Sequence, residues 1–235
     1  MNGPGSGFCE GAGAGPPAGV RARGLPVPFR LLAAFLLFEL VLQLGRLGLP
    51  LAVGWAGAAV IAFALLQPPP VALRPFAPLG VLCRYAPFAI AWLGFTVLYL
   101  RVAFWCGHPV PPQEVLDHLA KAGLVAADWP LVAGVVVLAP VVEEILFRGY
   151  LLGSLLLVLG PIPAQLVTAA AFGAVHTGGY QLPIGVLGLL FGWLRVRYGA
   201  LAPGMLAHAL HNALTFAVAL WWPHALDLMY PMSPR

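Results

Sequence analysis

Long apolar segments, separated by short polar connections, constrain this chain more than any other feature. Hydrophobic residues make up 61% of its 235 positions and charged residues only 9%, whereas a soluble domain usually carries about 25% charged residues. A helix needs about 20 mostly apolar residues to cross a bilayer. We therefore expect an all-α, polytopic transmembrane helix bundle, and the length suits one compact bundle.

Seven segments match the length of membrane-spanning helices, allowing for charged flanks that snorkel to the interface. A polar stretch after the third segment, PPQEVLDHLAKAG, predicts a short amphipathic surface helix that starts near Pro112. The predicted spans cover about 30–47, 51–67, 85–105, 129–159, 164–175, 182–196 and 201–222.

Polar residues inside the predicted spans lie nearly all in the second half of the chain. We therefore predict a catalytic four-span bundle at 129–222, preceded by an accessory region at 30–128 that holds three spans and the surface helix. The Gly-, Pro- and Ala-rich residues 1–29 predict a disordered tail without a cleavable signal peptide. Residues 223–235 are predicted to form a C-terminal tail.

Lys and Arg residues beside the spans predict the orientation of the chain in the membrane. A cytoplasmic N-terminus places seven of them inside, namely Arg21, Arg23, Arg30, Arg74, Arg84, Arg195 and Arg197. It leaves Arg46, Arg101, Lys121 and Arg235 outside. The cations are not interleaved with aromatic residues, so lipid is an expected partner and nucleic acid is not. The Arg-rich, Lys-poor composition indicates a bacterial cytoplasmic membrane protein.

The stretch VVEEILFRGY places two acids and an arginine within the fourth predicted span. Each unpaired charge at the centre of a membrane costs about 2.5–3.5 kcal/mol, so these side chains are expected to face the bundle interior as partners. Glu144 and Arg148 are four residues apart and can pair on one helix face, so Glu143 is the acid that this pairing does not use. Pro140 removes a helical hydrogen bond and is predicted to expose the carbonyl of Val136.

Two further polar pairs lie on later spans. Phe172 and His176 are four residues apart in AAFGAVHTGG, as are His208 and Asn212 in MLAHALHNAL. Each pair is therefore expected to share one helix face. His211 lies off the second face and is predicted to be a bystander.

Four of these residues suit peptide hydrolysis without a covalent intermediate. Glu143 is predicted to be the general base that takes a proton from water. His176 is predicted either to orient that water or to pass the proton to the leaving amine. His208 and Asn212 are predicted to donate hydrogen bonds to the oxyanion. Ser154 and Thr168 have no obvious partner that would activate a nucleophile. The expected substrate is a peptide or protein with a membrane-proximal or C-terminal cleavage site.

Other interpretations of the same residues stay open. In one, Glu143, His176 and His208 bind zinc and leave a position for water, although no HExxH motif occurs and Cys9, Cys83 and Cys106 share no metal-like spacing. The residues alone leave both this arrangement and the metal-free arrangement, with no cofactor, open; the family resemblance described next favours the metal-free arrangement. The chain could also be a proton-coupled transporter, since Glu and His relays line such pathways, or a non-catalytic immunity or scaffold protein. A structural salt bridge is the simplest alternative for the charged cluster.

The polar motifs, in this order, resemble the CPBP family of intramembrane proteases, which includes the CAAX proteases and the Abi bacteriocin-processing proteins. Glu143, Glu144 and Arg148 match its first motif, Phe172 and His176 its second, and His208 and Asn212 its third. The resemblance covers about 129–222 and implies that Glu144, Arg148 and Phe172 support the catalytic residues. Some members remove the last three residues of prenylated CAAX proteins, whereas many bacterial members have other roles.

Overall fold

The computed structural model describes residues 26–46, 50–71 and 74–230, and these ranges contain helices and no strand. The main helices are α1 (Val27–Arg46), α2 (Pro50–Leu66), α3 (Pro78–Trp105), α4 (Glu114–Ala122), α8 (Pro161–Ala174), α9 (Gln181–Tyr198), α10 (Ala202–Trp221) and α11 (His224–Met229). A short 3-10 turn, η1 (Ala126–Asp128), leads into a long composite helix. Its pieces are α5 (Trp129–Ala133), η2 (Gly134–Leu138), α6 (Ala139–Glu143), η3 (Glu144–Leu151) and α7 (Leu152–Leu155).

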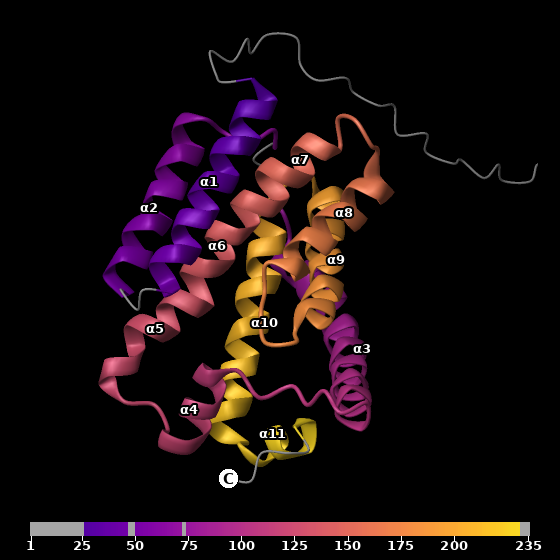
Figure 1. Ribbon diagram of the computed structural model, residues 1–235. Coiled ribbons are helices and arrows are strands. Elements are labelled where there is room, and N and C mark those ends of the chain that lie inside the picture. The colour runs from indigo at the N-terminus through magenta and orange to yellow at the C-terminus, as the bar shows by residue number, and fades with distance from the viewer. Residues whose placement is uncertain (1–25, 47–49, 72–73, 231–235) are drawn as a thin grey trace, which may run out of the picture.

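Helix α10 lies in the middle of the bundle, with the composite helix α5–α7 crossing it (Figure 1). Helices α1 and α2 pack together on one side of the composite helix, and α8, α9 and α3 lie on the other. α10 contacts α3, α4, α6, α9, α11 and η2. Because of this central position, side chains of α10 can contact both the composite helix and α9.

Each predicted span coincides with a helix, although α3 begins seven residues before the predicted third span. By length and composition, two described helices, Pro78–Trp105 and Trp129–Leu155, could cross a membrane, and Gly54–Leu66 is a shorter apolar helix. The total of seven spans stays a prediction. The predicted surface helix forms as α4, and α11 lies within the predicted C-terminal tail. Of the predicted N-terminal tail, residues 1–25 lie outside the described residues.

Hydrogen bonds join α3 to the later helices. The Tyr85 hydroxyl lies 3.1 Å from Nδ1 of His211. The indole of Trp92 donates to the carbonyl of Pro183 at 2.8 Å, and Tyr99 donates to the carbonyl of Gly179 at 2.7 Å. Although the sequence analysis grouped this span with an accessory region, α3 is therefore packed into the same bundle as α9 and α10.

Two π-helical segments interrupt the composite helix where the sequence analysis expected a proline bend. In η2 the backbone N–H of Ala139 donates to the carbonyl of Gly134, five residues back. The next residue in this register is Pro140, which has no N–H to donate to Val135. In this register the carbonyl freed by Pro140 is that of Val135, whereas α-helical spacing led to the prediction of Val136, which stays a prediction.

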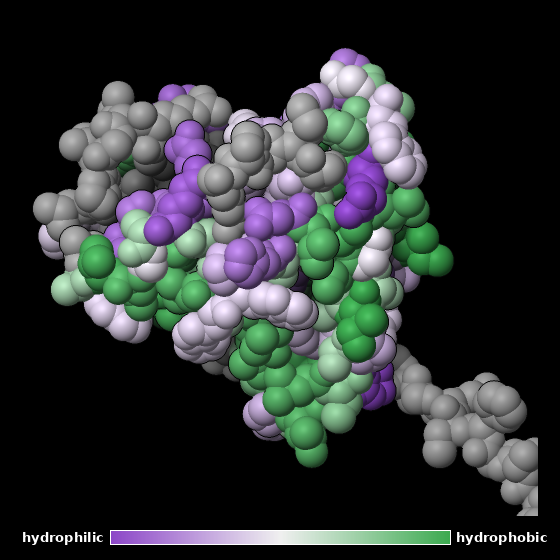
Figure 2. Space-filling view, turned by 90° about the horizontal axis from the view of Figure 1, so that it is seen from below, coloured by the Kyte–Doolittle hydropathy of each residue, from purple (hydrophilic) through white to green (hydrophobic). Residues whose placement is uncertain are grey.

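One end of the bundle is formed by α4, α11 and the adjacent loops. Figure 2 shows this end, where hydrophilic side chains gather centrally and hydrophobic ones lie around them. Helix α4 buries Leu116 and Leu119 and pairs Lys121 with Asp117 at 2.6 Å, so it is amphipathic as predicted. Four exposed tryptophans lie at helix ends near this side, namely Trp105, Trp129, Trp221 and Trp222. Tryptophan is typical of a membrane–water interface.

Candidate active site

Glu144 and Arg148 form a fully buried ion pair on η3. Nη1 of Arg148 lies 3.0 Å from Oε1 of Glu144, and both side chains are 0% exposed. Nη2 of Arg148 also donates to the carbonyl of Gly188 on α9 at 3.0 Å. The planar guanidinium holds separate nitrogens toward the carboxylate and the carbonyl in a fixed geometry, which the compact ammonium of a lysine lacks. The pair therefore links the composite helix to α9.

Aromatic rings surround this ion pair. The guanidinium carbon of Arg148 lies 4.2 Å from the ring centre of Phe172 and 5.2 Å from that of Phe191. The Phe191 ring also stacks on His208, with centroids 4.5 Å apart and planes 19° apart. Cation–π contacts of this kind are strongest away from water. Phe172, a predicted supporting residue, thus contacts the charged pair directly.

Two glycines make room for the charged side chains. A Cβ on Gly204 of α10 would lie 2.6 Å from Oε2 of Glu144, well inside van der Waals contact. A Cβ on Gly188 would lie 3.3 Å from Nη2 of Arg148 and 3.0 Å from the Phe172 ring. Glycine at these positions lets α9 and α10 approach η3 closely enough to enclose the ion pair.

His208 lies between the two glutamates. Its Nδ1 is 3.3 Å from Oε1 of Glu144, and its Nε2 is 3.8 Å from Oε2 of Glu143. The Glu143 side chain is 21% exposed, in contrast to the complete burial of Glu144. The acid that the sequence left unpaired is therefore also the more accessible one, and an imidazole faces it.

His176 is oriented by its own helix. Its Nδ1 lies 2.7 Å from the carbonyl of Phe172, which can only accept, so Nδ1 carries the proton. In the neutral imidazole this leaves Nε2 as an acceptor. The His176 ring packs edge-on against Phe172, with centroids 4.9 Å apart, and Phe172 also meets the His208 ring edge-on at 6.0 Å. Among the described residues, no hydrogen bond or ion pair joins His176 to Glu143.

Asn212 supports the interrupted helix. Its Nδ2 donates to the carbonyl of Val135 at 2.8 Å, which replaces the N–H that Pro140 lacks. An amide nitrogen carries two hydrogens, so one donor remains. His211, one residue earlier, contacts Tyr85 and Trp92 instead of the glutamates, so it lies away from the predicted catalytic residues as expected.

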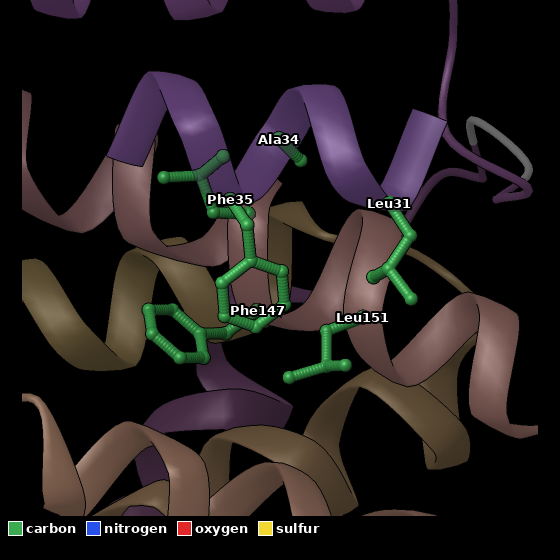
Figure 3. Close-up of a pocket in the computed structure, with 6 residues that line it drawn as sticks. Leu31, Ala34, Phe35, Phe147 and Leu151 are labelled. Atoms are coloured by element: carbon green, nitrogen blue, oxygen red, sulfur yellow. The ribbon is translucent and has the colours of Figure 1, made fainter. Parts of the chain in front are cut away.

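The three residues of the zinc hypothesis do not form a metal-binding group in the part of the chain that the structure describes. His208 and Glu143 are neighbours, but His176 is held by Phe172. A separate pocket lies between α1 and η3 and is lined by Leu31, Ala34, Phe35, Leu146, Phe147 and Leu151 (Figure 3). This lining has no ionisable side chain, so the pocket is not the site of the predicted chemistry.

The part of the chain that holds this cluster of residues matches a known protein family. Residues 125–214 match the family model of type II CAAX prenyl endopeptidases, described as Rce1-like. The match covers 90 of the 235 residues and supports the CPBP family of CAAX proteases for this part of the chain. All seven predicted site residues lie within the matched segment. The matched family implies a membrane protease, in agreement with the two described helices that are long and apolar enough to cross a membrane. No curated protein and no solved structure matches the chain.

Sequence reasoning missed several residues that build this candidate site. Phe191, Gly188 and Gly204 contact the charged cluster directly, and Val135 contributes only its backbone. A signal exists for Gly188 alone, because Gly188 and Gly192 are four residues apart on one face of α9. Nothing in the local sequence identifies Phe191, since its contact with His208 depends on how α9 and α10 pack.

Proposed function

We propose that the chain is an intramembrane endopeptidase in which Glu143 activates a water molecule for peptide hydrolysis. The observation that carries this proposal is the contrast between adjacent acids. Glu144 is enclosed and paired with Arg148, whereas Glu143 is partly exposed and faces Nε2 of His208 at 3.8 Å. A general base must reach its proton donor directly or through one water, and an enclosed, paired carboxylate cannot.

The reaction follows from the protonation states of these groups. Glu143 takes one proton from water while the water oxygen forms a bond to the peptide carbonyl carbon. Nε2 of His176, the acceptor left by the Nδ1 contact, orients the same water. The carbon–nitrogen bond then breaks, and the amine leaves with the proton that Glu143 received. The products are a carboxylic acid and an amine, no covalent enzyme intermediate forms, and the acid then loses its proton to the amine or to solvent.

Donors on α10 stabilise the oxyanion in this proposal. Asn212 has one amide N–H beyond the one bonded to Val135. His208 has carboxylates near both ring nitrogens, an arrangement that suits an imidazolium with two donors. Glu144 holds the ring through Nδ1, which directs Nε2 toward the substrate side. Removal of one such oxyanion donor typically costs about 10²–10³ in kcat.

The substrate class is tested with the purified protein in lipid vesicles. One probe is a farnesylated CAAX peptide, and the other is an unprenylated peptide with an apolar segment beside its cleavage site. We expect cleavage of at least one probe by the wild type and none by Glu143→Gln. Glu39→Gln is the matched control, because Glu39 is an exposed acid on α1 that bonds only to Gln43 among the described residues.

Each result of this assay has a clear meaning when folding is monitored by gel filtration and thermal unfolding. Cleavage by the wild type and by Glu39→Gln, with loss in a folded Glu143→Gln variant, supports the assignment. Full turnover by Glu143→Gln would exclude Glu143 as the base. A proteomic search for new chain ends in cells with and without the wild-type protein then identifies the natural substrate.

Metal dependence is measured on the same preparation. In the metal-free arrangement we expect activity to survive exhaustive chelation, with no stoichiometric zinc by elemental analysis. Zinc at one equivalent, with activity lost on chelation and restored by zinc alone, would support Glu143, His176 and His208 as ligands. In that arrangement the metal would lower the pKa of a bound water.

A further inference from the structure

A cationic cluster lies at the end of the bundle opposite α4 and α11, away from the charged residues of the active site. It consists of Arg74, Arg84 and Arg195, which meet around the turn that ends α9. Nη2 of Arg195 donates to the carbonyl of Pro70 at 3.1 Å. The guanidinium of Arg74 lies 3.4–3.6 Å from the position of a Cβ on Gly199, in the same turn. Nη1 of Arg84 lies 3.3 Å from the Tyr198 hydroxyl.

The cluster has an uncompensated positive charge. Arg195 is only 7% exposed, and its Nε has no hydrogen-bond partner among the described residues. Arg74 and Arg195 are close enough to repel one another. None of the three arginines forms an ion pair with a carboxylate in the described ranges of the chain. A buried cation without a counter-ion is unfavourable, so an anion is expected to bind here.

The end of α9 does not account for this charge. A helix C-terminus carries about half a negative charge, whereas the three guanidiniums carry one positive charge each. The beginning of α10 at Ala202, shortly after the turn, adds the positive end of another helix dipole. Arginine matches phosphate well, because its planar donors can bind two oxygens together.

A groove between α3 and α9 extends from the cluster along the apolar surface. It has a volume of about 530 Å³ and includes Arg84, Pro87, Phe88, Leu189, Leu190 and Trp193 in its lining. Arg84 thus belongs both to the groove and to the cationic cluster. An apolar channel with a cationic end has the shape and charge of a site for an amphiphile with an anionic head.

We propose that Arg74, Arg84 and Arg195 bind the phosphate of an anionic phospholipid whose acyl chain lies in the groove between α3 and α9. Basic pockets between transmembrane helices hold lipid head groups by this chemistry. The free inorganic ion could use the same arginines, but only a lipid would also fill the groove. Because the site lies outside the proposed catalytic residues, it does not depend on the proposed function.

Lipid retention during purification tests this proposal. The protein is exchanged into neutral detergent with equimolar phosphatidylglycerol and phosphatidylcholine, and bound lipid is counted by native mass spectrometry. Arg84→Gln is compared with Arg197→Gln, which removes the same charge at the same end. Arg197 is exposed and lies two residues after Arg195, about 200° around the helix, so it faces away from the cluster.

We expect the wild type and Arg197→Gln to retain phosphatidylglycerol in preference to phosphatidylcholine. Retention should fall roughly tenfold in Arg84→Gln and further in Arg74→Gln/Arg84→Gln, because charge-assisted hydrogen bonds to phosphate are lost. If the double variant does not fold, the single variant decides. Equal retention of both lipids by the wild type, or equal losses in Arg84→Gln and Arg197→Gln, would overturn the proposal. Thermal stabilisation by inorganic phosphate as large as that by phosphatidylglycerol would assign the site to the free ion and also overturn it.

Discussion

At the scale of single residues, Glu143 and Glu144 are chemically identical neighbours with different surroundings. Glu144 receives the guanidinium of Arg148 and the imidazole of His208, while Gly204 packs against its other oxygen. In the part of the chain that the structure describes, the ion pair of Glu143 is with the far ring nitrogen of His208, and part of its surface is open. The same side chain is thus enclosed in an ion pair in one position and partly exposed in the next.

The buried ion pair yields a prediction about stability. Arg148→Met should destabilise the protein by about 3–5 kcal/mol, because it leaves the Glu144 carboxylate buried without its partner. The double variant Glu144→Gln/Arg148→Met should recover part of this loss, since no unpaired charge remains. Thermal unfolding in detergent measures both variants. A double variant less stable than Arg148→Met would show that the charge of Glu144 is compensated elsewhere.

Gly204 yields a prediction about activity. In Gly204→Ala the new methyl group would lie 2.6 Å from Oε2 of Glu144, so the carboxylate or α10 must move. We expect a loss of about 1–3 kcal/mol in stability and a strong loss of cleavage, because Glu144 positions His208. Gly192→Ala is the matched control on α9, since its methyl would meet nothing closer than 3.6 Å. Equal effects of the two changes would contradict this account.

At the scale of elements, the π register of η2 gives Asn212 a structural role beside its proposed catalytic one. Asn212→Ala should cost about 1–3 kcal/mol, because the carbonyl of Val135 loses its only side-chain donor in the described structure. Pro140→Ala restores a backbone N–H at the position that can reach this carbonyl. The stability cost of Asn212→Ala should therefore shrink in the Pro140→Ala background.

The double variant separates the two roles of Asn212. If Asn212 also stabilises the oxyanion, Pro140→Ala/Asn212→Ala should be stable yet remain slow in the vesicle cleavage assay. Recovery of both stability and cleavage would assign Asn212 to positioning alone. An unchanged stability cost in the Pro140→Ala background would mean that Val135 is not the carbonyl left free by the proline.

The elements also explain which features could be predicted from the sequence. The structure confirms the helix positions, which are predicted from runs of apolar residues. It also confirms the pairing of Glu144 with Arg148, which is predicted from their spacing. The π segments were not predicted, because one additional residue per turn leaves no clear mark in an apolar sequence. The prediction of Val136 rests on α-helical spacing and does not take the π register into account. The contacts of Phe191 and Gly204 depend on how the helices pack, and local periodicity does not predict this packing.

At the scale of the whole molecule, the two ends of the bundle differ in charge. Arg74, Arg84 and Arg195 gather at one end, whereas Glu114 and Asp117 lie on α4 at the other. Under the positive-inside rule, the arginine end is expected in the cytoplasm. Helix α3 connects the two ends. The side of the membrane on which each end of α3 lies therefore defines the orientation of the bundle.

Two exposed cysteines on and next to α3 allow this orientation to be measured. Cys83 and Cys106 are 23 residues apart, or about 35 Å along a helix, which is close to the roughly 30 Å thickness of the hydrocarbon core. In a Cys9→Ala background, a membrane-impermeant maleimide added to intact cells should label Cys106, whereas Cys83 should react only after permeabilisation. The variants Cys83→Ala and Cys106→Ala assign each signal. Labelling of Cys83 alone in intact cells would show the opposite orientation, with the arginine cluster outside the cell. That result would contradict the orientation expected from the positive-inside rule.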